Sequence, residues 1–110
     1  MMQQESWLPV CALAMLLPAQ GRSARVGELQ LALFLLGERV YALDDRDPVS
    51  GIALLSRGIV GDLGGEPVVA SPLYKQRYAL DDGRCLDDAG LAVRSWPTRL
   101  DGDQVWINLA

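Results

Sequence analysis

The sequence contains no histidine, and this absence excludes several kinds of catalytic and metal-binding chemistry. Without an imidazole, the chain has no Ser-His-Asp or Cys-His nucleophile, no histidine-bound zinc and no imidazole base that titrates near neutral pH. A reaction carried out by this chain would therefore need a carboxylate, a thiol or a bound cofactor.

Cysteine is also scarce, because the chain has only Cys11 and Cys85, which lie far apart in the sequence. Two isolated cysteines are poor evidence for the disulfide framework of a secreted protein, although the sequence leaves a bond between them open. We expect two reduced, buried thiols in a cytoplasmic protein.

Aromatic residues and positive charge are both limited. Phe, Trp and Tyr make up 6% of the 110 residues, and 10 basic residues face 14 acidic ones, for a net charge of −4. The scattered Lys and Arg residues argue against nucleic acid or an anionic membrane as a partner, since either needs a basic face. Half of the residues are hydrophobic, so we expect a single domain over residues 1–110 with a core of Leu, Val and Ala.

The chain also lacks an apolar run long enough to cross a membrane. The apolar stretch over residues 8–19 is too short to span a bilayer, and Pro9 and Pro18 bracket it. The residues before it carry no Lys or Arg, which a secretory signal peptide requires near its start. We therefore expect a buried strand followed by a turn in this stretch, and no membrane attachment.

What the sequence does contain is a regular succession of Gly and Pro between short apolar segments. This pattern is typical of short strands joined by turns, and it leaves little room for helices. The segments with strand-like patterns are residues 29–36, 39–43, 67–70, 77–80, 84–86, 93–96, 98–100 and 104–109. We expect an all-β fold, an antiparallel sandwich or barrel of short strands.

The turn residues predict which of these strands are neighbours. Hairpins are expected across Gly37-Glu38, across Asp81-Asp82-Gly83 and across Asp101-Gly102. Residues 29–36 and the C-terminal strand are expected to offer open edges, through which copies of the chain would associate weakly.

Two other patterns suggest chemistry at first sight. Acidic residues cluster at Asp44-Asp45 with Asp47, at Asp81-Asp82 and at Asp87-Asp88. These clusters lack the spacing of an EF-hand and lie beside Gly or Pro, so we interpret them as turn residues. The glycines of residues 58–65 match neither a dinucleotide fingerprint nor a P-loop, so we expect a flexible, turn-rich loop there.

Two short loops centred on proline are the strongest candidates for a functional site. The first reads Asp47-Pro-Val-Ser-Gly51, and the second reads Ser71-Pro-Leu-Tyr-Lys-Gln76. Each follows a predicted strand, so the two loops are able to project beside each other. They resemble the loops that hold the [2Fe–2S] cluster of Rieske domains, where each loop supplies one Cys and one His. The resemblance implies a Rieske-like fold.

The residues at the four ligand positions differ from those of cluster-bearing Rieske domains. By this resemblance, Asp47 and Val49 stand in place of the first Cys and His, and Ser71 and Tyr74 in place of the second pair. Val49 has no donor atom, and the hydroxyls of Ser71 and Tyr74 ionise too reluctantly at neutral pH to be good iron ligands. We expect neither an iron–sulfur cluster nor another metal, and no catalytic residue, in this chain.

The sequence around these loops is similar to one family in particular, the small subunit of bacterial assimilatory NAD(P)H-dependent nitrite reductase. The segments that carry this similarity read DPVSG, LSRGIVGD and GEPVVASPLYKQ. In that family, the large subunit contains FAD, siroheme and a [4Fe–4S] cluster and reduces nitrite to ammonium. The resemblance implies a small, non-catalytic subunit without its own cofactor, which docks onto the large subunit during nitrate assimilation in the bacterial cytoplasm.

The tips of the two loops are the expected docking face, because apolar and aromatic residues stand there where turns usually have polar ones. The candidate interface residues are Val49, Ser50, Leu73, Tyr74, Lys75 and Gln76. The simpler alternative is that these residues only pack the two loops together. Two other functions stay open at this point: an enzyme or ferredoxin-type electron carrier with an unrecognised cofactor, and a free-standing binding module.

Overall fold

The computed structural model describes residues 7–73 and 75–109, and within them the chain is almost entirely β-structure. The strands are β1 (Trp7–Ala12), β2 (Gly21–Val26), β3 (Leu29–Leu36), β4 (Arg39–Asp44), β5 (Ile59–Leu63), β6 (Glu66–Ala70), β7 (Arg77–Ala79), β8 (Ser95–Trp96), β9 (Thr98–Asp101) and β10 (Gln104–Asn108). Two 3-10 helices, η1 (Leu13–Met15) and η2 (Leu55–Arg57), are the helical elements of this part of the chain. Neither is long enough to cross a bilayer.

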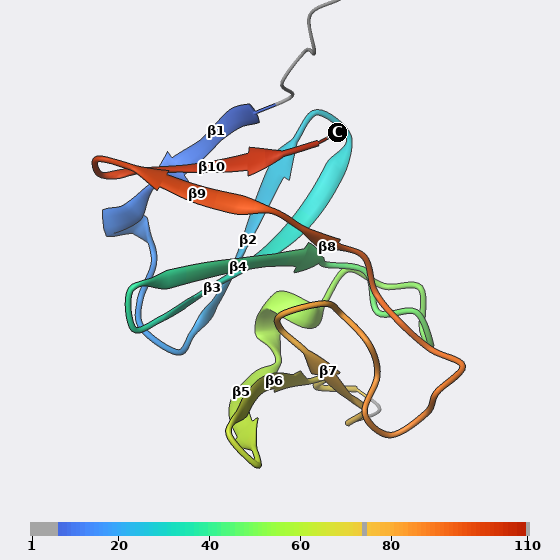
Figure 1. Ribbon diagram of the computed structural model, residues 1–110. Coiled ribbons are helices and arrows are strands. Elements are labelled where there is room, and N and C mark those ends of the chain that lie inside the picture. The colour runs from blue at the N-terminus through green and yellow to red at the C-terminus, as the bar shows by residue number, and fades with distance from the viewer. Residues whose placement is uncertain (1–6, 74, 110) are drawn as a thin grey trace, which may run out of the picture.

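The strands form three antiparallel sheets (Figure 1). The terminal sheet has the order β1-β10-β9, the central sheet β2-β3-β4-β8, and the lobe sheet β5-β6-β7. Strands β4 and β8 are neighbours in the central sheet, with Ala42 opposite Trp96 and Leu43 opposite Ser95. Residues 45–94, which lie between these strands in the sequence, therefore form an insertion, and we call it the lobe.

The lobe is attached to the central sheet by hydrogen bonds at its base. The indole N–H of Trp96 donates to the Asp44 carboxylate at 2.8 Å, and the Asp44 N–H donates to the Arg94 carbonyl at 2.9 Å. These bonds join the two ends of the insertion, so the lobe leaves the sheet and returns to it at one place (Figure 1). Both proline-centred loops belong to the lobe.

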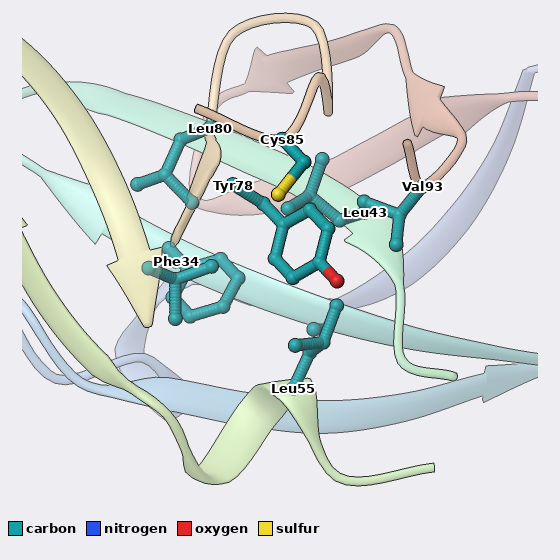
Figure 2. Packing of buried hydrophobic residues seen from close by; sticks show 9 residues of the cluster. Phe34, Leu43, Leu55, Tyr78, Leu80, Cys85 and Val93 are labelled. Carbon is teal, nitrogen blue, oxygen red and sulfur yellow. The ribbon is translucent and has the colours of Figure 1, made fainter. Parts of the chain in front are cut away.

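The hydrophobic core has two parts, one on each face of the central sheet. Leu31 and Leu33 of β3 pack with Val105 and Ile107 of β10 in the part that faces the terminal sheet. Ala32 and Phe34, the alternate residues of β3, face the lobe. The buried cluster on this side consists of Ala32, Phe34, Leu43, Leu55, Val69, Tyr78, Leu80, Cys85 and Val93 (Figure 2). A strand buried on both faces has a continuous apolar sequence, which explains the pattern of residues 29–36.

Most of the predicted strands are confirmed. The hairpin of β3 and β4 forms as expected, with β4 ending one residue later than predicted, and β6 begins one residue earlier. Strands β9 and β10 also pair as expected, although their turn is Gly102-Asp103 rather than Asp101-Gly102. The segment 93–96 is a strand only over Ser95–Trp96.

Several other expectations are wrong. Residues 58–65 are not a flexible loop, because Ile59–Leu63 is a strand that pairs with β6 across a Gly64-Gly65 turn. Residues 84–86 do not form a regular strand, but they pair with β7 as expected. Tyr78 and Cys85 form an antiparallel bridge, and the Ala79 N–H donates to the Arg84 carbonyl at 2.9 Å. Strand β7 also pairs with β6. The stretch 8–19 begins as a strand that is largely exposed, because β1 lies at the edge of the terminal sheet.

The expected open edges are also wrong. Strand β3 lies between β2 and β4, and β10 lies between β1 and β9, so neither is an edge strand. Strand β2 was not predicted, because its Arg22, Ser23 and Arg25 interrupt the apolar pattern of a typical strand. Both cysteines are free thiols; Cys85 is buried as expected, whereas Cys11 is only half-buried.

Candidate functional site: two loops joined at their bases

The first loop, residues 47–52, is a tight turn that begins at a completely buried residue. The Asp47 N–H donates to the Ile52 carbonyl at 2.8 Å, and the Gly51 N–H donates to the Asp47 carbonyl at 2.7 Å. The Asp47 side chain turns back over the loop, where its Oδ1 accepts the Val49 N–H at 2.8 Å. Gly51 has a φ of 76°, a left-handed conformation that glycine adopts without steric cost.

The second loop, residues 71–76, repeats these hydrogen bonds at the equivalent described positions. The Ser71 N–H donates to the Gln76 carbonyl at 2.8 Å, and the Lys75 N–H donates to the Ser71 carbonyl at 2.9 Å. The Ser71 Oγ lies 3.4 Å from the Leu73 N–H, as the Asp47 carboxylate lies beside the third residue of its own loop. Lys75 has a φ of 66° and thus takes the left-handed position that glycine occupies in the first loop.

A direct hydrogen bond joins the two loops at their first residues. The Ser71 hydroxyl donates to Oδ2 of Asp47 at 2.5 Å. Asp47 is 0% exposed and Ser71 is 1% exposed, so water does not compete for this bond. The Asp47 carboxylate makes no ion pair with any residue that the structure describes, and its charge is held by the Ser71 hydroxyl and the Val49 N–H.

A second buried carboxylate, Asp45, fixes the first loop to the body of the lobe. Its Oδ1 accepts the Ser56 N–H at 2.6 Å, and its Oδ2 accepts the Ser56 hydroxyl at 3.1 Å. The Asp45 N–H donates to the Gln30 carbonyl of β3, which connects the loop to the central sheet. Both aspartates were predicted to be ordinary turn residues, and their burial was not expected.

The tips of the loops have the opposite character from their bases. Val49 is 41% exposed, Ile52 54% and Leu73 48%, so three apolar side chains are accessible within two short turns. Two exposed basic residues, Arg46 and Lys75, lie near them in the sequence. We call Arg46, Val49, Ile52, Leu73 and Lys75 together the tip surface.

Comparisons with known proteins agree with the order of strands and loops. The model of the family described as the Rieske-like [2Fe–2S] domain matches residues 6–108. The chain belongs to this family. The NADH nitrite reductase small subunit of Escherichia coli (strain K12) is 36% identical over 96 residues, which cover 86% of this chain and 89% of the relative. At this level of identity and coverage, the chain also belongs among the nitrite reductase small subunits.

Two further relatives extend this result. The nitrite reductase [NAD(P)H] small subunit of Erwinia carotovora, solved in solution, has a TM-score of 0.83 and 39% identity, and the match covers 96% of this chain and 82% of that one. The nitrite reductase [NAD(P)H] large subunit of Klebsiella oxytoca is 50% identical over 101 residues. That match covers 92% of this chain but only 11% of the large subunit, so this chain spans a small part of that relative.

The residues of this chain do not fit a Rieske [2Fe–2S] cluster, which needs two thiolates and two imidazoles. Val49 offers no donor atom, and the Asp47 carboxylate and Ser71 hydroxyl are already bonded to each other. No group of three or more His, Cys, Asp or Glu residues gathers at a metal-binding distance within residues 7–73 and 75–109. Tyr74, which we placed at the fourth ligand position, lies outside the described residues.

A buried tyrosine lies behind the joined loops. Tyr78 is fully buried at the centre of the cluster between the lobe and the central sheet (Figure 2), and its hydroxyl has no hydrogen-bond partner among the described residues. Burial, with a further contribution from the negative charge of Asp47, raises the pKa of Tyr78 to about 12 from its ordinary value of 10.0. The hydroxyl therefore stays protonated and unpaired within an apolar cluster.

Replacing Tyr78 with phenylalanine is expected to stabilise the protein, by about 1 kcal/mol, because it removes an unpaired buried hydroxyl. The raised pKa also predicts a pH dependence: between about pH 10 and about pH 12 the unfolded state loses the Tyr78 proton while the folded state keeps it. Rising pH thus destabilises the wild type in this window, and Tyr78→Phe removes this contribution. Urea unfolding at neutral and alkaline pH measures both effects. The half-buried Tyr41, changed to Phe, is the control and is not expected to stabilise the protein.

Beside the second loop, Arg77 and Asp87 form an exposed ion pair. The Arg77 backbone N–H and guanidinium both donate to the Asp87 carboxylate, at 2.6 Å for the closest pair of atoms. These hydrogen bonds lower the pKa of Asp87 to about 2. The cation of Arg77 is therefore engaged locally, which leaves Lys75 as the accessible positive charge of the second loop.

The structure brings most of the predicted interface residues to one place. Val49 and Leu73 are exposed, each two residues from the hydrogen bond that joins the loops. Ser50 and Gln76 are half-buried, with the Ser50 hydroxyl accepting the Ile52 N–H at 3.1 Å. Arg46 and Ile52 were not predicted, although an apolar residue directly after the glycine of a turn was a usable signal for Ile52.

Proposed function

We propose that this chain is the small, non-catalytic subunit of an NAD(P)H-dependent nitrite reductase, in which it docks onto the large subunit through the tip surface. In this role it serves nitrate assimilation in the bacterial cytoplasm. The main support for this proposal is that a small subunit and a large subunit of this enzyme both contain a segment similar to nearly the whole chain. A domain that occurs within the polypeptide of a large subunit is suited to lie against that subunit.

The tip surface is the part of the lobe best suited to such a contact. Exposed apolar side chains on tightly fixed turns lose little conformational freedom on binding, so their burial contributes directly to affinity. Lys75 also supports this role. A lysine at a positive φ costs conformational energy, which the glycine at the equivalent position of the first loop avoids. A lysine at such a position indicates that its side chain has a use there. Two basic residues on a chain of net charge −4 favour an acidic rim on the partner surface.

In this proposal, the chain has a structural role in the complex and carries out no redox chemistry. Its ligand positions do not fit a [2Fe–2S] cluster, and it has no histidine to serve as a general base. FAD, siroheme and a [4Fe–4S] cluster, the groups implied by the family, would belong to the large subunit. Nitrite reduction would then take place on the large subunit.

Reconstitution with the large subunit of the same organism tests this proposal. We expect the purified chain to be colourless, with less than about 0.1 iron per chain, because it offers no thiolate pair for a cluster. We also expect it to co-elute with the large subunit in gel filtration and to increase nitrite-dependent NAD(P)H oxidation. Stoichiometric iron with visible absorption would contradict the cluster-free role, and separate elution would contradict the subunit role.

A further inference from the structure

The hydrogen bond between Asp47 and Ser71 has a particular place in the lobe. Among the described residues, it is the only hydrogen bond that joins residues 47–52 to residues 71–76. The other bonds of each loop close that loop on itself, apart from one in which the adjacent Arg46 guanidinium donates to the Gly51 carbonyl at 2.8 Å. The bonds of Asp45 fix the first loop to η2 and β3. The orientation of one loop relative to the other therefore depends on this contact and on the packing beneath it.

Each end of the bond is coupled directly to one apolar residue of the tip surface. Asp47 accepts the Val49 N–H with the carboxylate whose other oxygen accepts the Ser71 hydroxyl. The Ser71 oxygen lies beside the Leu73 N–H on the other side. Val49, Asp47, Ser71 and Leu73 thus form one continuous chain of polar contacts across the two loops.

We propose that Asp47 and Ser71 are positioning residues for docking, which hold Val49 and Leu73 in one apolar face before the partner arrives. This inference rests on the proposed docking function and adds to it the device that organises the interface. A charge-assisted hydrogen bond in a site without water is short and directional, so it restricts the relative movement of the loops. A face organised in advance loses less conformational entropy on binding.

A bond that merely stabilises the lobe would have a different signature, and the chain offers a matched control. Asp45 and Ser56 form a second buried Asp–Ser pair, with a hydroxyl-to-carboxylate distance of 3.1 Å, which does not join the loops. Ser56→Ala and Ser71→Ala each leave one buried carboxylate oxygen without its hydroxyl donor. We expect both variants to melt at a lower temperature than the wild type.

Binding to the large subunit, measured by calorimetry at a temperature where the variants are folded, separates the two roles. We expect Ser71→Ala to weaken the affinity by about tenfold, equivalent to about 1.4 kcal/mol, while Ser56→Ala stays within about twofold of the wild type. Equal affinities of the two variants would overturn the positioning role. If Ser71→Ala does not fold, Ser71→Cys and Ser56→Cys replace the alanine pair, because a thiol keeps the shape but is a weak donor.

A separate variant distinguishes failure of this inference from failure of the docking function. Val49→Asp combined with Leu73→Asp places charges on the tip surface without touching Ser71 or the Asp47 side chain. If this double variant binds as tightly as the wild type, the docking face is wrong and the positioning role falls with it. If it loses binding while Ser71→Ala binds like Ser56→Ala, docking stands and the positioning role alone is overturned.

Discussion

The double variant Val49→Asp/Leu73→Asp is expected to weaken binding to the nitrite reductase large subunit by about 100-fold or more. Both side chains are more than two-fifths exposed in the free chain, and burial against a partner would remove them from water. An aspartate at the centre of such a contact is desolvated without a counter-charge, which costs about 1–3 kcal/mol or more for each buried charge left unsatisfied. Titration calorimetry with the large subunit measures the effect.

The fold of this variant should be unaffected, since exposed loop positions rarely change stability by more than about 0.5 kcal/mol. Ile59→Asp is the matched control. Ile59 is 74% exposed on β5 and is the most exposed large apolar side chain of the described residues, yet it does not belong to the tip surface. We expect Ile59→Asp to bind normally. Equal loss of affinity in the control and the double variant would contradict docking through the loops.

Gly83→Ala is expected to cost about 3–5 kcal/mol of unfolding free energy. A Cβ at this position would lie 2.0 Å from the Val93 carbonyl oxygen, and the φ of 81° is unfavourable for alanine. The backbones are held together by the Val93 N–H, which donates to the Gly83 carbonyl at 2.9 Å. Relief of the collision must move Val93, a member of the buried cluster, so overpacking and backbone strain add.

Gly64→Ala isolates the conformational part of this cost. Gly64 also has a positive φ, 63°, but nothing lies within 4 Å of the position its Cβ would take. Only the left-handed conformation is then unfavourable, by about 1–2 kcal/mol. Chemical denaturation of the two variants measures the difference, and equal destabilisation would show that the contact with Val93 relaxes freely.

The sequence predicted the class of fold and the position of the candidate site, because both depend on local patterns. Turn residues located the β3–β4 and β9–β10 hairpins, and the proline-centred frames located both loops. The lack of a donor atom at Val49 can be predicted without the structure, because it follows from the residue type at a position that the family pattern identifies. Strand β2 was missed because a half-exposed edge strand has little apolar periodicity.

A weak local sequence pattern also explains why β5 was not predicted as a strand. Its glycine and aspartate are typical of turns, and only the partner strand β6 makes residues 59–63 extended. When no strong turn signal joins two segments, the tertiary structure determines whether they pair. It also determines which strand lies at the edge of a sheet. The open edges that we expected at residues 29–36 and at the C-terminal strand are covered by β2 and β1, which the sequence patterns did not predict as their neighbours.

The sequence by itself determined that this chain is all-β. It also predicted, through a family resemblance, that two equivalent loops stand where Rieske domains have their metal-binding loops, with residue types that are poor iron ligands. Only the tertiary structure decided that Asp47 and Ser71, which lie 24 positions apart, meet in a buried hydrogen bond. The physical reason is that turn propensity acts within a few residues. The burial of a carboxylate, by contrast, depends on which distant hydroxyl and backbone groups the fold brings to it.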